Sequence, residues 1–221
     1  MLSHLDRIVF PDRCEVLEIV PSQRYVYVIF KNGYSSFETF KITNPCRIII
    51  NQQIQKLTNI DVIVRDPQDR LISGINTFIQ HTVRDNPNLD PITVEWFALN
   101  YFSLNRHYAS QFSWLLNLAR YSDPDTTLHF LPMSAIGDIT GLDMKPLGIQ
   151  QAPKELTNQI NLTTHNKMYQ RIDAVIFGCI GQFMTFTQLL QHIKTVDSPA
   201  YEYVIGYAQQ ILNPTYALSQ T

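Results

Sequence analysis

The chain has 221 residues, of which 45% are hydrophobic and 16% charged, and its formal net charge is −2. This length fits one full-sized domain, so we expect a single domain over residues 1–221. The near-neutral balance without a basic stripe argues against a nucleic-acid partner, so any anion site must be local. Three cysteines (Cys14, Cys46 and Cys179) are widely spaced and never form CxxC, which predicts separate buried thiols rather than disulfides or a zinc site.

The amino-terminal segment MLSHLDRIVFPDRCEVLEIV mixes charged residues into every apolar stretch, which is typical of neither a secretory signal nor a membrane anchor. No later apolar run has the length that a membrane span needs. We therefore expect a soluble, cytoplasmic protein with no membrane span. The sequence leaves the oligomeric state open.

Strand and helix patterns alternate along the chain. Runs of aromatic and β-branched residues predict strands over 25–30, 47–50, 61–64 and 127–131. Helical spacing, caps and turn residues predict helices over 35–44, 52–57, 66–79, 95–104, 111–118, 172–193 and 201–212. This alternation predicts an α/β fold with a mainly parallel central sheet flanked by helices.

The segment KNGYSSF, which joins the first expected strand to its helix, suits a phosphate group. Gly33 allows a tight turn, Lys31 adds a positive charge, and Ser35 and Ser36 offer hydroxyls beside the free amides of the helix start. It is not a Walker A motif, because the lysine precedes the only glycine, and this disfavours an ordinary ATPase or kinase. Taken alone, the segment also fits a plain Asn-Gly turn followed by a capping box of Ser35 and Glu38.

A second polar segment, VIVRDPQDRLISGINTF, follows the third expected strand. Arg65 stands at the carboxyl end of that strand, where ligands of open α/β sheets bind, and its guanidinium suits a phosphate monoester. The alternative is a salt bridge between Arg65 and Asp66 at the helix start. Helical spacing places Arg70, Ser73 and Thr77 on a polar face that is turned away from the packing face.

The two segments together resemble a pair of motifs in sulfotransferases. KNGYSSF resembles their 5′-phosphosulfate loop, and RDPQDRLISG resembles their 3′-phosphate motif RDPxxRxxSG, in the same order along the chain. The resemblance implies a P-loop-NTPase-like three-layer sandwich that uses 3′-phosphoadenosine 5′-phosphosulfate (PAPS) and no metal. It also implies a 5′-phosphosulfate site made by Lys31, Asn32, Gly33, Tyr34, Ser35, Ser36 and Phe37, and a 3′-phosphate site made by Arg65 and Ser73. Tyr34 departs from the family pattern, in which small residues are commoner.

Sulfuryl transfer needs positive charge at the leaving phosphate and a base for the acceptor hydroxyl. Lys31 would serve the leaving group. His107 is the first candidate base, because HYASQ resembles the H-[WY]-x-x-Q segment of carbohydrate sulfotransferases; alternatively, His107 and Gln111 share a hydrogen bond at i, i+4 on one helix. Further candidate bases are His81, Glu38 and Glu95, whereas His129 is expected to be a satisfied core residue of an apolar strand.

The expected function is PAPS-dependent transfer of a sulfuryl group to a hydroxyl acceptor such as a carbohydrate, with the product 3′-phosphoadenosine 5′-phosphate (PAP) as the other nucleotide ligand. The N-terminus lacks the anchor of Golgi sulfotransferases, which indicates a bacterial or virus-encoded protein. One alternative is a non-catalytic nucleotide-binding or assembly module that retains the fold. A nucleotide kinase or hydrolase with an atypical loop is disfavoured, because GK[ST] and an acidic magnesium motif are missing.

Overall fold

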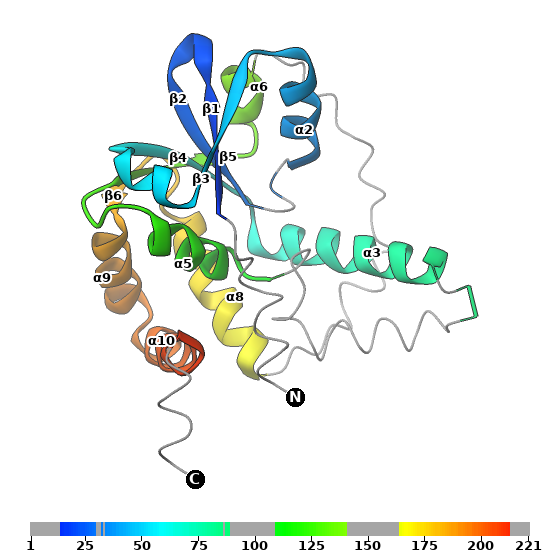
Figure 1. Ribbon diagram of the computed structural model, residues 1–221. Helices are drawn as coiled ribbons and strands as arrows, with labels where there is room; N and C mark the ends of the chain where they lie inside the picture. The colour runs from blue at the N-terminus through cyan, green and yellow to red at the C-terminus, as the bar shows by residue number, and fades with distance from the viewer. Residues whose placement is uncertain are drawn as a thin grey trace.

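The computed structural model describes residues 14–29, 32, 34–85, 87–88, 109–140 and 164–212. Six strands form one sheet, and they are β1 (Glu15–Ile19), β2 (Arg24–Val28), β3 (Cys46–Ile50), β4 (Asn59–Val64), β5 (Thr127–Pro132) and β6 (Phe183–Thr185). Their order across the sheet is β3-β1-β2-β4-β5-β6 (Figure 1). All four expected strands therefore exist, as β2 to β5.

The sheet is mixed rather than mainly parallel. β2, β4 and β5 are parallel neighbours, but β1 runs antiparallel to both β2 and β3, and β6 runs antiparallel to β5. The expected first strand is thus the second: β1 precedes it, and only the 3-10 turn η1 (Val20–Ser22) separates the two. A connection this short can only return the chain antiparallel, whereas the parallel pairs have long crossovers.

Helices cover both faces of the sheet. They are α2 (Tyr34–Thr43), α3 (Pro67–Asp85), α5 (Gln111–Tyr121), α6 (Ala135–Thr140), α8 (Thr164–Phe177), α9 (Phe186–Val196) and α10 (Ser198–Leu212), together with the 3-10 helix η2 (Asn51–Lys56). The core on one face contains residues of α2 and α6, and the core on the other contains residues of α5, α8, α9 and α10 (Figure 1). The described residues therefore form three layers, helix, sheet and helix.

The central strand β4 shows why this layering is stable. Its sequence NIDVIV is almost continuously apolar, as expected for a parallel strand that is covered on both faces. Ile60, Val62 and Val64 point into the core under α5 and α8, and Ile63 points into the core under α2 and α6. Asp61 is the polar exception on the α2 and α6 face.

The expected helix over 172–193 is two helices with a strand between them. α8 ends at Phe177, a turn follows, and β6 then pairs with β5 before α9 begins at Phe186. Gly181 in this turn has a φ of 82°, which L residues rarely adopt, and its N–H donates to Phe130 O at 2.9 Å. The expected helix over 95–104 lies outside the described residues.

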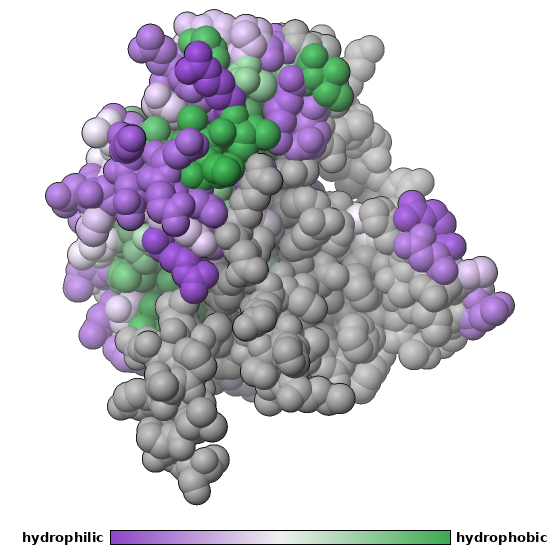
Figure 2. All heavy atoms as spheres, in the orientation of Figure 1, coloured by the Kyte–Doolittle hydropathy of each residue, from purple (hydrophilic) through white to green (hydrophobic). Residues whose placement is uncertain are grey.

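Hydrophobic side chains gather on the surface over β3, one of the two edge strands of the described sheet (Figure 2). Ile48 of this strand is 43% exposed. Within residues 14–29, 34–85, 109–140 and 164–212, no helix combines the length and the apolar character that a membrane crossing requires.

Candidate functional site

Two of the sequence segments meet at one edge of the sheet because β2 and β4 are parallel neighbours. Their register pairs Val28 with Ile63, so both strands end at the same edge. Asn32 of the KNGYSSF segment follows β2, and Arg65 follows β4 directly. The Asn32 side chain crosses between the two strand ends, since its Nδ2 donates to Ile63 O at 2.8 Å.

Gln111, the first residue of α5, bridges the two segments. Its Oε1 accepts from Arg65 N at 2.9 Å and its Nε2 donates to Arg65 O at 2.9 Å, so its amide pairs with both backbone groups of Arg65. The same Oε1 accepts from Asn32 Nδ2 at 2.7 Å. Asn32 and Gln111 are both fully buried. One side chain therefore ties the end of β4 to the loop after β2.

The start of α5 is held from α8 by Asp173. One carboxylate oxygen of Asp173 accepts from Gln111 N at 2.8 Å and the other from Phe112 N at 2.9 Å. These backbone groups are among the N–H groups that lack partners inside a helix at its first turn. Ser110 caps a third, because its Oγ accepts from Ser113 N at 3.1 Å. Buried helix starts need such partners, and here one comes from a distant helix.

A buried arginine of α3 accompanies Asp173. Arg70 is 2% exposed, and its Nη1 donates to the carbonyl oxygen of Ala109 immediately before the α5 cap. Burial lowers the pKa of Arg70 to about 10, and the attraction of Asp173 partly opposes this shift. Burial likewise raises the pKa of Asp173 to about 6, against the opposing effects of Arg70 and of the two backbone N–H donors. Two opposite charges are therefore desolvated beside the bridge.

Arg70 therefore does not lie on a solvent-facing polar side of α3, as the helical spacing predicted. Leu71 and Ile75 pack as expected, but Arg70 is buried as deeply as they are. Ser73 is half-buried, and its backbone carbonyl accepts from Thr77 Oγ1 at 3.0 Å. Helical periodicity ranks faces by side-chain polarity, and it cannot anticipate a charge that finds a carbonyl and a carboxylate in the interior.

Arg65 is half-buried at the sheet edge. Burial lowers its pKa, and the attraction of Asp69 and Asp66 opposes the shift. Asp66 acts as the expected cap of α3, because its Oδ1 accepts from Asp69 N at 2.9 Å. Arg65 is thus a cation at the carboxyl end of a central parallel strand, which is where the sequence placed it.

The KNGYSSF segment is described only in part. Its helix α2 begins at Tyr34, so Ser35 lies inside the first turn and is not the cap that the capping-box prediction required. Phe37 is 1% exposed and belongs to the core under α2 and α6, so its side chain does not face the sheet edge. Lys31 and Gly33, and the side chains of Tyr34, Ser35 and Ser36, lie outside the described residues.

Most of the candidate bases fall outside the described residues. His107, Glu95 and the side chain of His81 are among these. Glu38 is paired with Lys41 at 2.5 Å on α2. The expected bond between His107 and Gln111 on one helix requires a helix that spans both residues, but α5 begins at Gln111, whose side-chain bonds go to Asn32 and Arg65.

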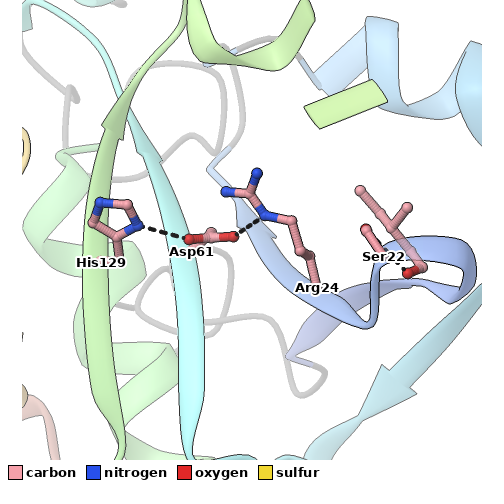
Figure 3. A network of polar contacts seen from close by, with 5 residues as sticks. Ser22, Arg24, Asp61 and His129 are labelled. Atoms are coloured by element: carbon pink, nitrogen blue, oxygen red, sulfur yellow. Dashed lines mark hydrogen bonds and ion pairs between the residues drawn. The ribbon is translucent and has the colours of Figure 1, made fainter. Parts of the chain in front are cut away.

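His129 takes part in a separate polar row on the sheet face that α2 and α6 share. Its Nδ1 lies 2.9 Å from Asp61 Oδ1, and Arg24 Nε donates to Asp61 Oδ2 at 2.8 Å, so Asp61 lies between the two side chains (Figure 3). Phe183 stacks on the imidazole with ring centroids 3.9 Å apart and is itself 66% exposed. His129 has a polar partner, as expected, but it is half-buried rather than part of the apolar core.

Sequence reasoning missed the bridge and its support. Asp173 carried a usable signal: it shares the spacing of Tyr169, Ile172 and Ile176, which form the buried face of α8. A carboxylate at an apolar-face position must find donors in the interior. Gln111 was singled out only as the partner of His107 in HYASQ, and nothing near it in sequence indicated that it joins two strand ends.

Comparisons with known proteins give no further assignment. A scan against protein-family models finds none that matches the chain, and searches of the curated proteins and of the solved structures find no match. The functional assignment therefore depends on the motifs and on the geometry of the β2 and β4 ends.

Proposed function

We propose that this chain is a PAPS-dependent sulfotransferase with a P-loop-NTPase-like layering of its helices and sheet. The observation that carries the proposal is the bridge of Gln111 between the end of β4, where RDPQDRLISG begins, and Asn32 of KNGYSSF. Two segments that resemble phosphate motifs thus lie at neighbouring ends of parallel strands, which is the usual ligand edge of an α/β sheet.

The residues at this edge fit the two ends of a bisphosphorylated nucleotide. The first turn of α2 supplies backbone N–H groups for a 5′-phosphosulfate, with Lys31, Ser35 and Ser36 as the side-chain donors that the motif implies. Arg65 offers a guanidinium for the 3′-phosphate, and its partial burial strengthens such a contact. Ser73, one helical turn beyond Arg70 on α3, is the second residue that the motif assigns to this phosphate.

PAPS would supply the sulfuryl group, and the chain would hold its leaving phosphate and position the acceptor. In this proposal Lys31 stabilises the charge that develops on the leaving phosphate. His107 accepts the proton of the acceptor hydroxyl and stands in the chain just before the pinned start of α5. The acceptor is a hydroxyl compound, with carbohydrates as the first class to test.

The nucleotide preference tests the proposal. Isothermal titration calorimetry should show that PAP binds at least tenfold more tightly than 5′-AMP or ATP, because only PAP places a phosphate at Arg65. Arg65→Ala should weaken PAP binding by about 10- to 100-fold, since a hydrogen-bonded charge pair is worth roughly 1.5–3 kcal/mol. Arg84→Ala is the matched control, because Arg84 lies exposed near the far end of α3, the helix that follows Arg65, and should leave the affinity unchanged.

Equal binding of PAP and 5′-AMP by the wild-type protein would refute the proposal. Turnover needs a second assay, in which labelled PAPS is incubated with glycans, phenols and lipids. Transfer that disappears in His107→Ala while PAP affinity is retained would support His107 as the base. PAP binding without transfer to any acceptor would instead support a non-catalytic nucleotide-binding module.

A further inference from the structure

Gln111 fixes the orientation of the Arg65 backbone as well as its position. A carboxamide holds its donor and acceptor in one plane, and both are used on the N–H and C=O of the same residue at 2.9 Å each. A single hydrogen bond would allow the end of β4 to rotate about it, but two bonds prevent this rotation. The direction in which the Arg65 side chain leaves the sheet is therefore set by α5.

The same amide fixes the loop after β2. Asn32 uses Nδ2 for two acceptors, Gln111 Oε1 at 2.7 Å and Ile63 O at 2.8 Å, while its backbone N–H donates to Ile29 O at 2.9 Å. Asn32 is thus attached to both strand ends and to α5. Because Gln111 Oε1 accepts from Asn32 and from Arg65 N, one atom sets the separation of the two segments.

The surroundings of Gln111 prevent the bridge from shifting. Asp173 holds its backbone N–H, and Arg70 holds the carbonyl of Ala109 two residues earlier. A buried charge pair adds little to stability compared with apolar residues of the same size, so stability alone does not explain why Arg70 and Asp173 lie in the interior. Both polar atoms of the Gln111 side chain are hydrogen-bonded in this network, which favours one arrangement of the groups that it joins.

A rigid separation matters for a ligand that has two phosphates. Binding the second phosphate adds its full energy only when the two anion contacts already lie at the separation that the ligand imposes. If the segments could move apart, each phosphate could still be bound, but ordering the segments would consume part of the gain. A ligand with one phosphate would lose much less from such movement.

We propose that Gln111 is a specificity-determining positioning residue, which makes the site select a nucleotide 3′,5′-bisphosphate over a nucleotide monophosphate by fixing Arg65 relative to Asn32. This inference rests on the proposed function, since it concerns the same edge of the sheet. It assigns selectivity to a buried side chain that does not touch the ligand.

The test compares affinity ratios rather than single affinities. Titration calorimetry of the full chain with PAP and with 5′-AMP gives the ratio of the two dissociation constants. Gln111→Leu keeps the side-chain volume but removes all three side-chain bonds, and it should lower the preference for PAP at least tenfold. Asn117→Leu is the control in the same helix, because Asn117 is a buried amide further along α5 whose side-chain atoms bond to neither segment. It should leave the ratio unchanged even if it lowers the melting temperature.

A second variant keeps the test decisive if Gln111→Leu does not fold. Asn32→Ala removes the side-chain bonds from Asn32 to Gln111 and to Ile63 O but leaves the pairing of Gln111 with Arg65, so it should lower the ratio about three- to tenfold. When both variants fold, the double variant should lose less selectivity than the two single losses combined, because both substitutions break the bond between Asn32 and Gln111.

The outcomes separate this inference from the proposed function. If the wild-type protein binds PAP and 5′-AMP equally, the proposed function fails and the inference fails with it. If the wild-type protein prefers PAP but the folded Gln111 and Asn32 variants keep that preference, only the inference is overturned. A ratio that falls equally in Asn117→Leu would also overturn it, since the loss would then follow from general destabilisation of α5.

Discussion

Removing the Asp173 carboxylate should destabilise the fold far more than removing an aspartate with similar bonds near the surface. In Asp173→Ala, the N–H groups of Gln111 and Phe112 lose their buried acceptor. Arg70 also remains charged in the interior without the carboxylate that attracts it. Breaking a buried charge pair on one side costs about 3–5 kcal/mol. That is a large part of the roughly 5–15 kcal/mol that stabilises a typical domain.

Asp197 provides the comparison. It also accepts a backbone N–H at a helix start, from Ala200 at 3.2 Å, and it also pairs with an arginine, Arg171. Arg171 is 47% exposed, however, so the pair is worth at most about 1 kcal/mol and the cap about 1 kcal/mol more. We expect Asp197→Ala to cost about 1–2 kcal/mol, which is roughly half or less of the cost at Asp173.

Equilibrium denaturation in urea measures both costs, provided that the slope of the unfolding free energy against urea stays the same. Replacing Arg70 as well should recover part of the loss, so that Arg70→Met with Asp173→Ala is more stable than Asp173→Ala alone. A cost at Asp173 no greater than that at Asp197, or a double variant with simply additive losses, would refute the coupling of the two buried charges.

Three further predictions address protonation, backbone conformation and thiol reactivity. Because the pKa of Asp173 is raised to about 6, the folded state between pH 4 and 6 holds a proton that the unfolded state has released. As the pH rises from 4 to 6.5, the unfolding free energy of the wild type should therefore fall by about 2–3 kcal/mol relative to that of Asp173→Asn. A difference between the two proteins that does not change with pH would contradict this. Gly181→Ala should lower the unfolding free energy by about 1 kcal/mol because of its positive φ, whereas Gly206→Ala inside α10 should raise it by about 1 kcal/mol. Calorimetry measures both changes, and effects of the same sign would be inconsistent with the backbone argument. In the folded protein Cys46 should react with a thiol reagent long before Cys14, because Cys14 is 1% exposed and burial raises its pKa to about 12. Timed labelling followed by mass spectrometry gives the order of reaction, and faster labelling of Cys14 would refute the prediction.

The layering and most of the sheet were predictable from local patterns. β4 was recognised because its β-branched run is short and ends at the polar residues Arg65 and Asp66. β1 was missed because the glutamates of EVLEI are three residues apart, which breaks the alternation that identifies a half-buried strand. The single helix expected over 172–193 was wrong because the positive φ of Gly181 outweighed an apolar spacing that fits helix on both sides.

The candidate site was predictable only in its local parts. The cap at Asp66 and the position of Arg65 at a strand end follow from a few neighbouring residues, and the structure agrees with both. The bridge joins Asn32, Arg65 and Gln111 across long stretches of sequence, and its support comes from Asp173 on another helix. No local pattern encodes such a contact, because it depends on strand order and on the packing of α5 against α8.

The contact between Asp173 and the start of α5 can form only late in the synthesis of the chain. The carboxylate and the amide that it binds are 62 residues apart, so the helix start cannot be anchored until α8 has been synthesised and has docked. A nascent chain that ends after β5 already contains KNGYSSF, RDPQDRLISG and Gln111. It still lacks Asp173, which holds the start of α5 and thereby the position of Gln111 between the two segments. Under the proposed function, nucleotide would therefore protect chains that include α8 against proteolysis but would not protect chains that end before it.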